Sequence, residues 1–265
     1  MDIIKVSDIS SYLEEEIPPE MKEPYDNVGL LVGFEDKAVT GVLVALDITE
    51  PVIAEACKMG AELIISHHPL FFSCKSIRAS DLIGRKVIRL IEGGMSAICV
   101  HTNLDAVSWG VNSALAQCLD LSMISLLVEQ GRDSEGNPYG MPRVGVLEAP
   151  LNMEDFLKKG KAALNSNGLR YHDSGRLVQR VAVCGGSGGS FLEAAAAQGC
   201  DTLVTSDIKY NVFLEAKEMG INIIDGDHFA TENVVCPVLR DKLKEKYPQL
   251  EIFVSSVHRQ TVEFY

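Results

Sequence analysis

Histidines and carboxylates recur in this sequence at a spacing that suits metal binding. Two histidines stand side by side directly after an apolar run, and two further histidines each precede a carboxylate by four residues after another apolar run. The candidate ligands are His67 and His68, His101 and Asp105, and His228 and Glu232. Imidazole nitrogens mixed with carboxylate oxygens suit zinc, manganese, iron, cobalt or nickel, whereas magnesium alone prefers fewer imidazoles.

Carboxylates with two oxygens extend this chemistry from one ion to two. The carboxylate of Asp105 or Glu232 can bridge two metal ions. Five side chains can therefore hold two divalent ions about 3.5 to 4 Å apart. A water between such ions loses a proton near neutral pH and becomes a nucleophile. His101 is the ambiguous member, because it can bind metal or orient Asp105 from behind; we expect the second role.

Each of these residues also has a plain structural interpretation. His101 and His228 can cap helices, Asp105 and Glu232 can serve helix N-termini, and the His67-His68 pair can satisfy buried carbonyls. Their joint occurrence at the ends of matching apolar runs favours the metal hypothesis.

Other polar residues suggest substrate contacts. Asp207 and Lys209 follow an apolar run in the second half of the chain and are candidates for binding substrate or for acid and base roles. The glycine-rich stretch 185–190, with Ser187, lacks the Lys-Ser/Thr of a Walker loop and the full dinucleotide-binding spacing. A tight strand-to-helix turn is the expected structure, with phosphate contact as the alternative.

The elements that must position these residues alternate between strand and helix. Short apolar runs predict strands, and amphipathic stretches between them predict helices, the first with Ser7 as its N-cap. Expected strands cover 41–46, 61–66, 97–100, 124–128, 143–147, 181–184, 201–205, 221–224 and 250–255, and expected helices cover 7–17, 51–59, 80–92, 110–119, 152–164, 191–198, 209–219 and a stretch ending near 245. This alternation predicts an α/β fold with mixed, largely parallel sheets flanked by helices.

An internal repeat divides the chain into two similar lobes, which we place at 1–125 and 126–265. Aligning Gly60 with Gly199 sets His68 over Asp207 without a gap, and aligning Gly94 with Gly220 brings His101 over His228 with a single gap. The polar ends of equivalent strands are then expected to meet across a pseudo-twofold axis, at the strand ends where open parallel sheets bind ligands.

Composition limits the classes of function. No apolar run approaches the roughly 20 residues needed to span a bilayer, and no signal peptide is evident, so we expect a cytoplasmic protein. The seven cysteines include no Cys-x-x-Cys pair, which argues against a thiolate zinc site or a disulfide framework. The net charge of −13 disfavours nucleic acid as the main ligand.

Five motifs resemble one protein family. They are Tyr-Asp-Asn-Val-Gly-Leu-Leu-Val-Gly at 25–33, Ile-Ser-His-His-Pro-Leu-Phe-Phe at 65–72, His-Thr-Asn-Leu-Asp at 101–105, Thr-Ser-Asp-Ile-Lys-Tyr at 205–210 and Gly-Asp-His-Phe-Ala-Thr-Glu at 226–232. In this order they resemble the GTP cyclohydrolase I type 2 homologues. The resemblance implies two lobes, two divalent metals in an interlobe cleft and a homohexameric ring. It also implies a ligand set of His67, His68, Asp105, His228 and Glu232, with His101 beside them.

The family name implies an activity, which is the expected function here. Metal-activated water would attack the imidazole carbon of guanine in GTP and release formate. Hydrolysis of another nucleotide or phosphate ester is one alternative, and a regulatory or scaffold protein with structural metals is another. Two departures from the family pattern, Ser206 in place of glycine and Asn211 in place of histidine, make the substrate less secure than the metal.

Overall fold

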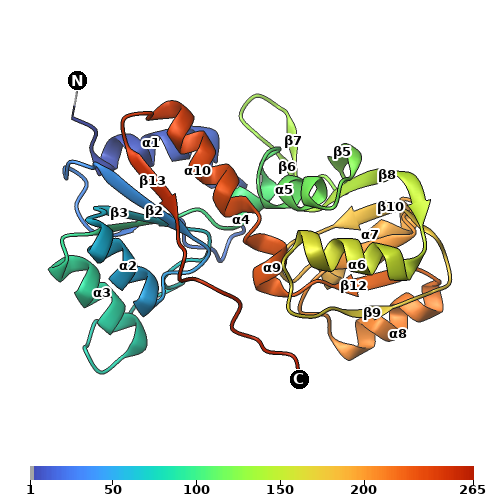
Figure 1. Ribbon diagram of the computed structural model, residues 1–265. Helices are drawn as coiled ribbons and strands as arrows, with labels where there is room; N and C mark the ends of the chain where they lie inside the picture. The colour runs from blue at the N-terminus through green and yellow to red at the C-terminus, as the bar shows by residue number, and fades with distance from the viewer. Residues whose placement is uncertain (1–2) are drawn as a thin grey trace. The chain divides into compact units, whose positions relative to one another are not determined.

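The chain forms two compact units. The structure is a computed structural model that describes residues 3–265. Unit 1 combines the chain up to Leu104 with Cys236–Arg259, and unit 2 combines Asp105–Val235 with Gln260–Tyr265. This division differs from the single boundary expected after residue 125, because the chain returns to unit 1 to complete its sheet and helix layer. Figure 1 labels the elements of both units.

Unit 1 is built on a five-stranded sheet in the order β1-β4-β3-β2-β13, counted within residues 3–265. Strand β1 runs antiparallel to β4, and the pairs β4-β3, β3-β2 and β2-β13 are parallel. Its elements are α1 (Val6–Glu16), η1 (Pro19–Met21), β1 (Gly29–Val32), β2 (Gly41–Ala45), α2 (Glu50–Met59), β3 (Leu63–Ser66), α3 (Leu82–Glu92), β4 (Ser96–Cys99), α10 (Val235–Lys246) and β13 (Glu251–Val254), and α4 (Thr102–Ala106) follows β4.

Unit 2 is built on a six-stranded mixed sheet in the order β5-β8-β10-β11-β12-β9 within the described part of the chain. Strands β10, β11 and β12 are parallel, and β5, β8 and β9 join through antiparallel pairs. Its elements are α5 (Val111–Cys118), β5 (Ser122–Leu126), β6 (Gly131–Arg132), β7 (Pro138–Tyr139), β8 (Arg143–Leu151), α6 (Met153–Ala163), β9 (Arg170–His172), β10 (Val178–Val183), η2 (Gly189–Phe191), α7 (Leu192–Ala197), β11 (Thr202–Thr205), α8 (Tyr210–Met219), β12 (Asn222–Asp225) and α9 (His228–Glu232).

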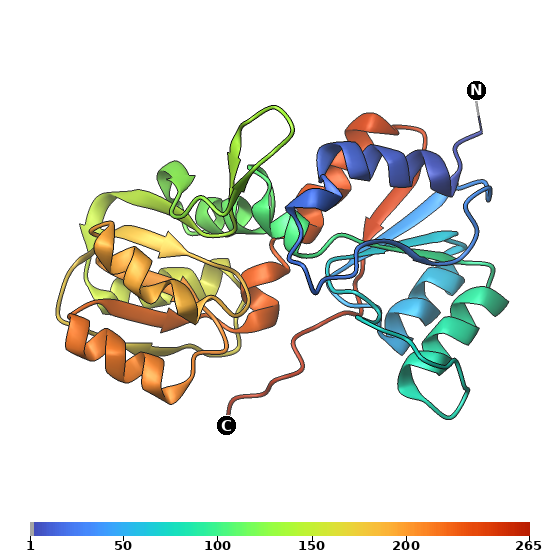
Figure 2. The same ribbon diagram turned by 180° about the vertical axis from the view of Figure 1, so that it is seen from behind.

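Helices cover both faces of each sheet, which explains why the central strands β3, β4, β11 and β12 are buried along their whole length. In unit 1, α2 and α3 pack on the face that carries Leu43 and Ile64, and α1 and α10 lie on the other face (Figure 1). In unit 2, Val181 and Val204 face α5 and α6, whereas Ala182 faces α7 and α8. Figure 2 shows α7 and α8 in orange on the near side of this sheet. The α/β fold expected from the sequence is confirmed.

Local signals explain both ends of α2. The side chain of Thr49 accepts a hydrogen bond from the backbone N–H of Val52 at 3.3 Å, and Gly60 ends α2 in the left-handed conformation. The predicted Ser7 cap of α1 is wrong. Helix α1 begins at Val6, so Lys5 is the N-cap residue, and the Asp8 carboxylate accepts its backbone N–H at 2.8 Å.

The two sheets repeat one motif. The succession β2-α2-β3-α3-β4 in unit 1 matches β10-α7-β11-α8-β12 in unit 2, and in each case an antiparallel strand, β1 or β9, pairs with the last strand of the motif. A carboxylate at an equivalent position accepts hydrogen bonds from the backbone at the start of each motif. Glu62 accepts backbone N–H groups of Thr40 and Gly41, and Asp201 accepts those of Gln179 and Arg180. The sequence alignment of Gly60 with Gly199 therefore has a structural counterpart within each unit.

The helices also bear on membrane association. Among residues 3–265, no helix combines the length and the apolar character that a bilayer span requires.

Candidate functional site

Unit 1 gathers three imidazoles at the carboxyl ends of β3 and β4. One ring nitrogen from each of His67, His68 and His101 lies within 4.8 Å of the other two. The ring centroids are 5.0 Å apart for His67 and His68 and 5.1 Å apart for His67 and His101. Parallel neighbours β3 and β4 end at the same edge of the sheet, so the segments that follow them bring these side chains together.

Each of these imidazoles is held by its Nδ1 atom. His68 Nδ1 lies 2.8 Å from Asp47 Oδ1, and His101 Nδ1 lies 2.8 Å from Asp26 Oδ1. His67 Nδ1 lies 3.0 Å from the backbone oxygen of Val100. All three partners are acceptors, so Nδ1 must carry the proton and Nε2 is the nitrogen with the lone pair in the neutral ring. This is the arrangement that fixes histidine ligands in metal sites.

Asp26 is the most firmly embedded of these anchors. Its side chain is fully buried, and besides His101 it accepts the backbone N–H of Thr102 at 3.0 Å and the Thr102 hydroxyl at 2.5 Å. Burial by itself raises the pKa of Asp26, but the hydrogen bonds from His101 and Thr102 outweigh it and hold the pKa well below its usual range. Asp26 is therefore ionised at neutral pH and acts as a fixed negative partner of His101.

Asp47 serves His68 in a more open setting. Its side chain is 40% exposed. The partial burial of this side chain raises the pKa of Asp47. Hydrogen bonds from His258 and His68 outweigh that effect and hold the pKa well below its usual range. Asp47 is thus also an ionised acceptor at neutral pH.

Unit 2 buries two carboxylates near one thiol. Asp105 and Glu232 are 7% and 4% exposed. Burial raises the pKa of the Cys184 thiol, and the negative charges of Asp105 and Glu232 raise it further. The guanidinium of Arg143 donates to the backbone oxygens of Ala106 and Val107, both at 2.9 Å. It therefore fixes the turn that follows Asp105 and places a positive charge near that carboxylate.

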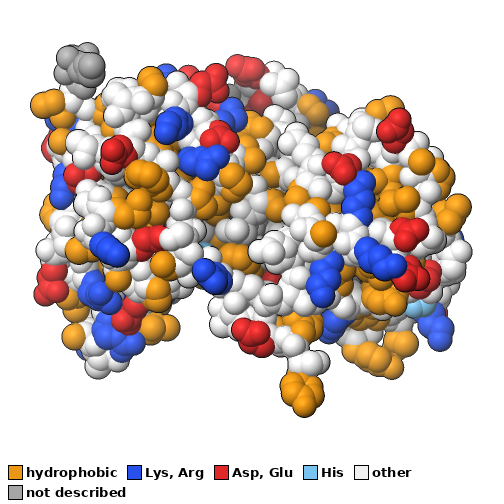
Figure 3. Space-filling view, viewed as in Figure 1, with side chains coloured by type: hydrophobic (Ala, Val, Ile, Leu, Met, Phe, Trp, Pro, Cys, Tyr) orange, Lys and Arg blue, Asp and Glu red, His pale blue; other side chains and the backbone are white. Residues whose placement is uncertain are grey.

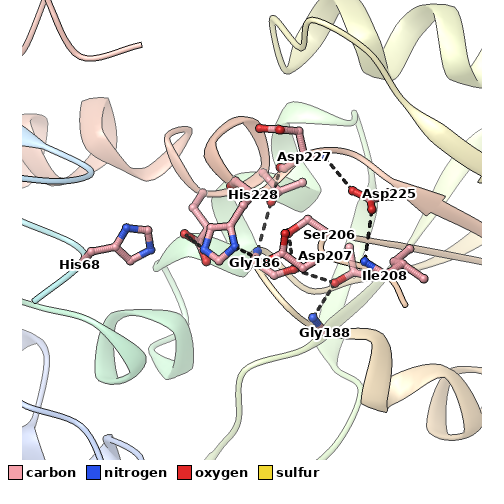
Figure 4. Close-up of polar contacts among 12 residues, drawn as sticks. His68, Gly186, Gly188, Ser206, Asp207, Ile208, Asp225, Asp227 and His228 are labelled. Atoms are coloured by element: carbon pink, nitrogen blue, oxygen red, sulfur yellow. Dashed lines mark hydrogen bonds and ion pairs between the residues drawn. The ribbon is translucent and has the colours of Figure 1, made fainter. Parts of the chain in front are cut away.

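His228 joins two carboxylates in unit 2. Its Nε2 atom lies 3.0 Å from Glu232 Oε2, and its Nδ1 atom lies 2.7 Å from Asp207 Oδ2 (Figure 4). Burial lowers the pKa of His228, but hydrogen bonds and attraction from Glu232 and Asp207 outweigh it and raise the pKa to about 9. A positive charge is therefore favoured between these carboxylates. The N-cap of α9 is Asp227, whose side chain accepts the N–H of Ala230 at 3.1 Å, so His228 does not cap this helix.

The glycine-rich stretch at 185–190 is a tight strand-to-helix turn, as its sequence favoured. A side chain at Gly186 would meet Glu232 Oε1 at 2.1 Å, so glycine allows the backbone to approach the carboxylate. The N–H groups of Gly185, Gly186 and Gly188 donate to the side chains of Asn112, Thr231 and Thr205. The Gly186 carbonyl accepts from the Ser206 hydroxyl, and Figure 4 labels both residues. Three of the N–H groups that a phosphate cradle would use are therefore engaged within unit 2.

A hollow of about 340 Å³ lies beside this turn in unit 2. Ser187, Asp207 and Lys209 line it, and Lys209 is the N-cap residue of α8. Asn211 also lines it and donates to Glu215 at 3.0 Å. The three predicted substrate-binding residues thus share one polar hollow, and their contact with a substrate stays a prediction.

The predicted ligands gather in two groups, each described within its own unit. His67, His68 and His101 form the group in unit 1, and His228 and Glu232 form a direct pair in unit 2, near the Cys184 thiol that Asp105 also influences. The role of His101 as an orienting residue for Asp105 stays a prediction.

Sequence reasoning missed the residues that hold the imidazoles. Asp26, Asp47 and His258 are absent from the candidate residues that the sequence suggests. The one available signal was that Asp26 and Asp47, like the ligands, follow or precede apolar runs. Spacing alone does not distinguish such anchors from turn residues, because the distances that define them are tertiary.

The face of the molecule shown in Figure 3 gives no simple indication of the ligand. On the face shown in Figure 3, acidic and basic side chains are interspersed with hydrophobic ones on each unit. The chain is acidic overall, with a net charge of −13. An anionic substrate would therefore need local positive charge, from a metal or from side chains such as Lys209.

Known proteins resemble this chain over its whole length. A Clostridium perfringens protein named GTP cyclohydrolase 1 type 2 homolog is 37% identical over 264 residues, which cover 98% of this chain and 100% of that protein. The crystal structure of a Staphylococcus aureus hypothetical protein matches with a TM-score of 0.93 at 31% identity and full coverage of both chains. The structure of a Bacillus cereus protein related to NIF3 has a TM-score of 0.94 at 23% identity with full coverage of both chains, which shows likeness of fold.

These relatives confirm the resemblance inferred from the five motifs. The family model described as Duf34/NIF3 (NGG1p interacting factor 3) matches residues 4–261. The chain therefore belongs to the Duf34/NIF3 family.

Proposed function

We propose that this protein binds two divalent transition-metal ions and uses them to hydrolyse a nucleotide. The proposed ligands are His67, His68, Asp105, His228 and Glu232, with His101 beside them as an orienting residue. The observation that carries the proposal is that the Nδ1 atoms of all four histidines contact oxygen acceptors at 2.7 to 3.0 Å. In the neutral ring, a proton on Nδ1 leaves the lone pair on Nε2, which is the nitrogen that can bind a metal.

The donor set fits the group that it would hold. Neutral imidazoles and carboxylates are the ligands of zinc, manganese, iron, cobalt and nickel sites. His228 lies between Glu232 and Asp207, so this position already favours positive charge. Bound divalent ions would supply Lewis acidity and lower the pKa of a water toward neutrality.

The remaining groups of the site would act on the substrate. We assign Lys209 and Ser187 to contact with phosphate or sugar oxygens, because both line the hollow in unit 2 beside Asp207. Asp207 holds the His228 ring through Nδ1 and so fixes its orientation. The curated relatives bear the name GTP cyclohydrolase 1 type 2 homolog. GTP is therefore the first nucleotide to test, with opening of the guanine imidazole ring and release of formate as the expected reaction.

Elemental analysis of protein purified without added metal tests whether the protein binds divalent metal ions, on which every proposed activity depends. We expect about two divalent ions per chain in the wild type and fewer in Glu232→Gln. Glu148→Gln is a matched control, because Glu148 is an exposed carboxylate on β8. A wild type with no bound metal, which also fails to take up zinc, manganese or cobalt, would contradict the proposal.

A formate assay with GTP then tests the activity. We expect formate release by the metal-loaded wild type and by Glu148→Gln, and a large loss in Glu232→Gln. Turnover of other nucleotides or phosphate esters, without turnover of GTP, would mean that one of these compounds is the substrate. Bound metal without turnover on the whole panel would favour a regulatory or scaffold protein with structural metals. Light scattering on the same samples tests the homohexamer, which the family resemblance alone implies.

A further inference from the structure

One carboxylate in unit 1 joins two imidazoles. Asp47 Oδ1 lies 2.8 Å from His68 Nδ1, and Asp47 Oδ2 lies 2.9 Å from His258 Nε2. His258 comes from the segment that follows β13, far from the other two residues in the sequence. Its side chain is only 9% exposed, whereas that of Asp47 is 40% exposed. The largely buried ring of His258 thus holds the second oxygen of a half-open carboxylate.

The direction of these hydrogen bonds follows from the acceptor. A carboxylate accepts and does not donate, so His68 donates from Nδ1 and His258 donates from Nε2. Asp47 therefore selects the His68 tautomer whose Nε2 atom can bind a metal. A carboxylate tethered at both oxygens has one defined plane, and its ability to orient His68 depends on that plane.

The segment that carries His258 is itself built into unit 1. The backbone N–H of Ser255 donates to the Val44 carbonyl at 2.8 Å, and the N–H of Ser256 donates to Glu55 Oε1 at 2.9 Å. The hydroxyls of both serines also donate to Glu55, which lies on α2. The N–H of His258 donates to the Ser255 hydroxyl at 3.2 Å. His258 is therefore held in place by its own supports.

We propose that His258 is a positioning residue for His68 and acts through Asp47. The inference rests on the proposed metal function, since His68 is one of its ligands. Asp47 also attracts the ammonium group of Lys86, which offers the carboxylate a competing partner. Without His258, Asp47 can turn toward Lys86 or water, and His68 loses the contact that fixes its tautomer and ring plane.

Two substitutions of His258 test whether its hydrogen-bond donor to Asp47 matters, independently of the imidazole ring that carries it. His258→Leu removes the donor, whereas His258→Gln keeps an amide N–H that can reach Asp47. Glu55→Gln weakens the support of the whole segment without changing His258. His172→Leu is the matched control, because His172 lies on β9 in unit 2. Thermal unfolding of each variant establishes that it is folded.

The first measurement is the tautomer of His68 in the metal-free full-length protein, by NMR of protein labelled with ¹⁵N in its six histidines. We expect the Nδ1–H tautomer in the wild type, in His258→Gln and in His172→Leu. The Nε2–H tautomer should gain population in His258→Leu and, to a smaller extent, in Glu55→Gln. An unchanged His68 tautomer in folded His258→Leu would overturn the inference. If His258→Leu does not fold, Glu55→Gln decides the question by the same criterion.

The second measurement is the zinc affinity, by competition with a chelator. We expect the dissociation constant to rise about 3- to 10-fold in His258→Leu, below the roughly 10- to 100-fold effect of losing a direct anchor, and to recover in His258→Gln. Zinc binding that is equally tight in His258→Leu and the wild type would overturn the inference and leave the proposed function intact. A wild type that binds no metal would contradict the proposed function, while the tautomer measurement would still decide the role of His258.

Discussion

The two units share a strand-and-helix motif but end it with different chemistry. After β3, unit 1 carries the imidazoles of His67 and His68, and the equivalent positions after β11 in unit 2 carry Ser206 and Asp207. In unit 1 a carboxylate serves an imidazole, as Asp47 serves His68; in unit 2 Asp207 serves His228 in the same way. The comparison shows that the motif fixes where polar groups emerge, whereas the residue types at its ends decide their roles.

The anchors of the two units also differ in burial. The Asp26 side chain is fully buried in unit 1, and the Asp207 side chain in unit 2 is 56% exposed. A buried carboxylate supports both the fold and the imidazole that it holds, because its loss leaves buried donors unsatisfied. An exposed one can be exchanged with little effect on the fold. Variants at equivalent positions can therefore test how far the likeness between the units extends.

The largest expected effect is on the stability of unit 2. Arg143 is 4% exposed and donates to the carbonyls of Ala106 and Val107 and to the Ser113 hydroxyl. Arg143→Met should lower the free energy of unfolding by about 3 to 5 kcal/mol, because it leaves buried acceptors without their donor. Denaturant unfolding measures this loss.

The control for this prediction is a second arginine in the same sheet. Arg180 on β10 donates to the Gln198 carbonyl at 3.1 Å in an exposed contact. Arg180→Met should change stability by no more than about 0.5 kcal/mol. Equal losses in the two variants would contradict the role assigned to Arg143.

A smaller effect on stability is expected for the two carboxylates, Asp26 and Asp207, that hold imidazoles but differ in burial. Asp26→Asn and Asp207→Asn should each weaken zinc binding about 10- to 100-fold, since each loosens one imidazole of the proposed site. Only Asp26→Asn should also destabilise the protein, by about 1 to 3 kcal/mol, because Thr102 loses a charged acceptor in a buried place. Chelator competition and denaturant unfolding measure the two properties separately. If Asp207→Asn is destabilised as much as Asp26→Asn, burial does not explain the difference between the units.

The paired carboxylates at the start of each motif should behave alike at neutral pH. Glu62→Gln and Asp201→Asn should each cost about 1.5 kcal/mol, because each weakens hydrogen bonds from two backbone N–H groups to a charged acceptor. Urea unfolding at pH 7 provides the values. A loss confined to one unit would show that the two carboxylates are equivalent in position only.

The pH dependence at Glu62 follows from its pKa. Burial raises the pKa of Glu62, but hydrogen bonds from Thr40 and Gly41 outweigh it and lower the pKa below the usual value. The ionised carboxylate therefore stabilises unit 1 above the unfolded-state pKa of about 4.3, and this contribution is lost as pH falls through the lower folded-state value. The gap in stability between the wild type and Glu62→Gln should narrow at pH 3. A gap that widens there would contradict the assignment.

The smallest effect is expected at the helix ends that the two motifs share. Gly60 and Gly199 have φ angles of +72° and +73°, and a Cβ atom at either position would meet nothing within 4 Å. Gly60→Ala and Gly199→Ala should therefore each cost about 1 kcal/mol from backbone strain alone. Thermal unfolding of the two variants should give equal shifts. A much larger loss at one position would reveal packing that differs between the units.

Much of the fold could be predicted because its signals are local. Thr49, Pro51 and Gly60 define α2 by capping chemistry, and the apolar runs of β2 and β3 reflect burial on both faces. The return of β13 to the sheet of unit 1 was not predictable from such signals. It depends on pairing with β2 across a long stretch of chain, and residue patterns do not encode the identity of a distant neighbour.

The sequence by itself determined the family, the alternation of elements, the repeat and the residue types that can bind metal, because each depends on the order and spacing of neighbouring residues. The tertiary structure alone decided that Asp26, Asp47 and Asp207 hold imidazoles, that Arg143 fixes the turn after Asp105, and that His258 reaches Asp47. These contacts join residues from 21 to 211 positions apart. Hydrogen bonds depend on distance and angle in space, which the chain acquires only when its sheets and helices pack.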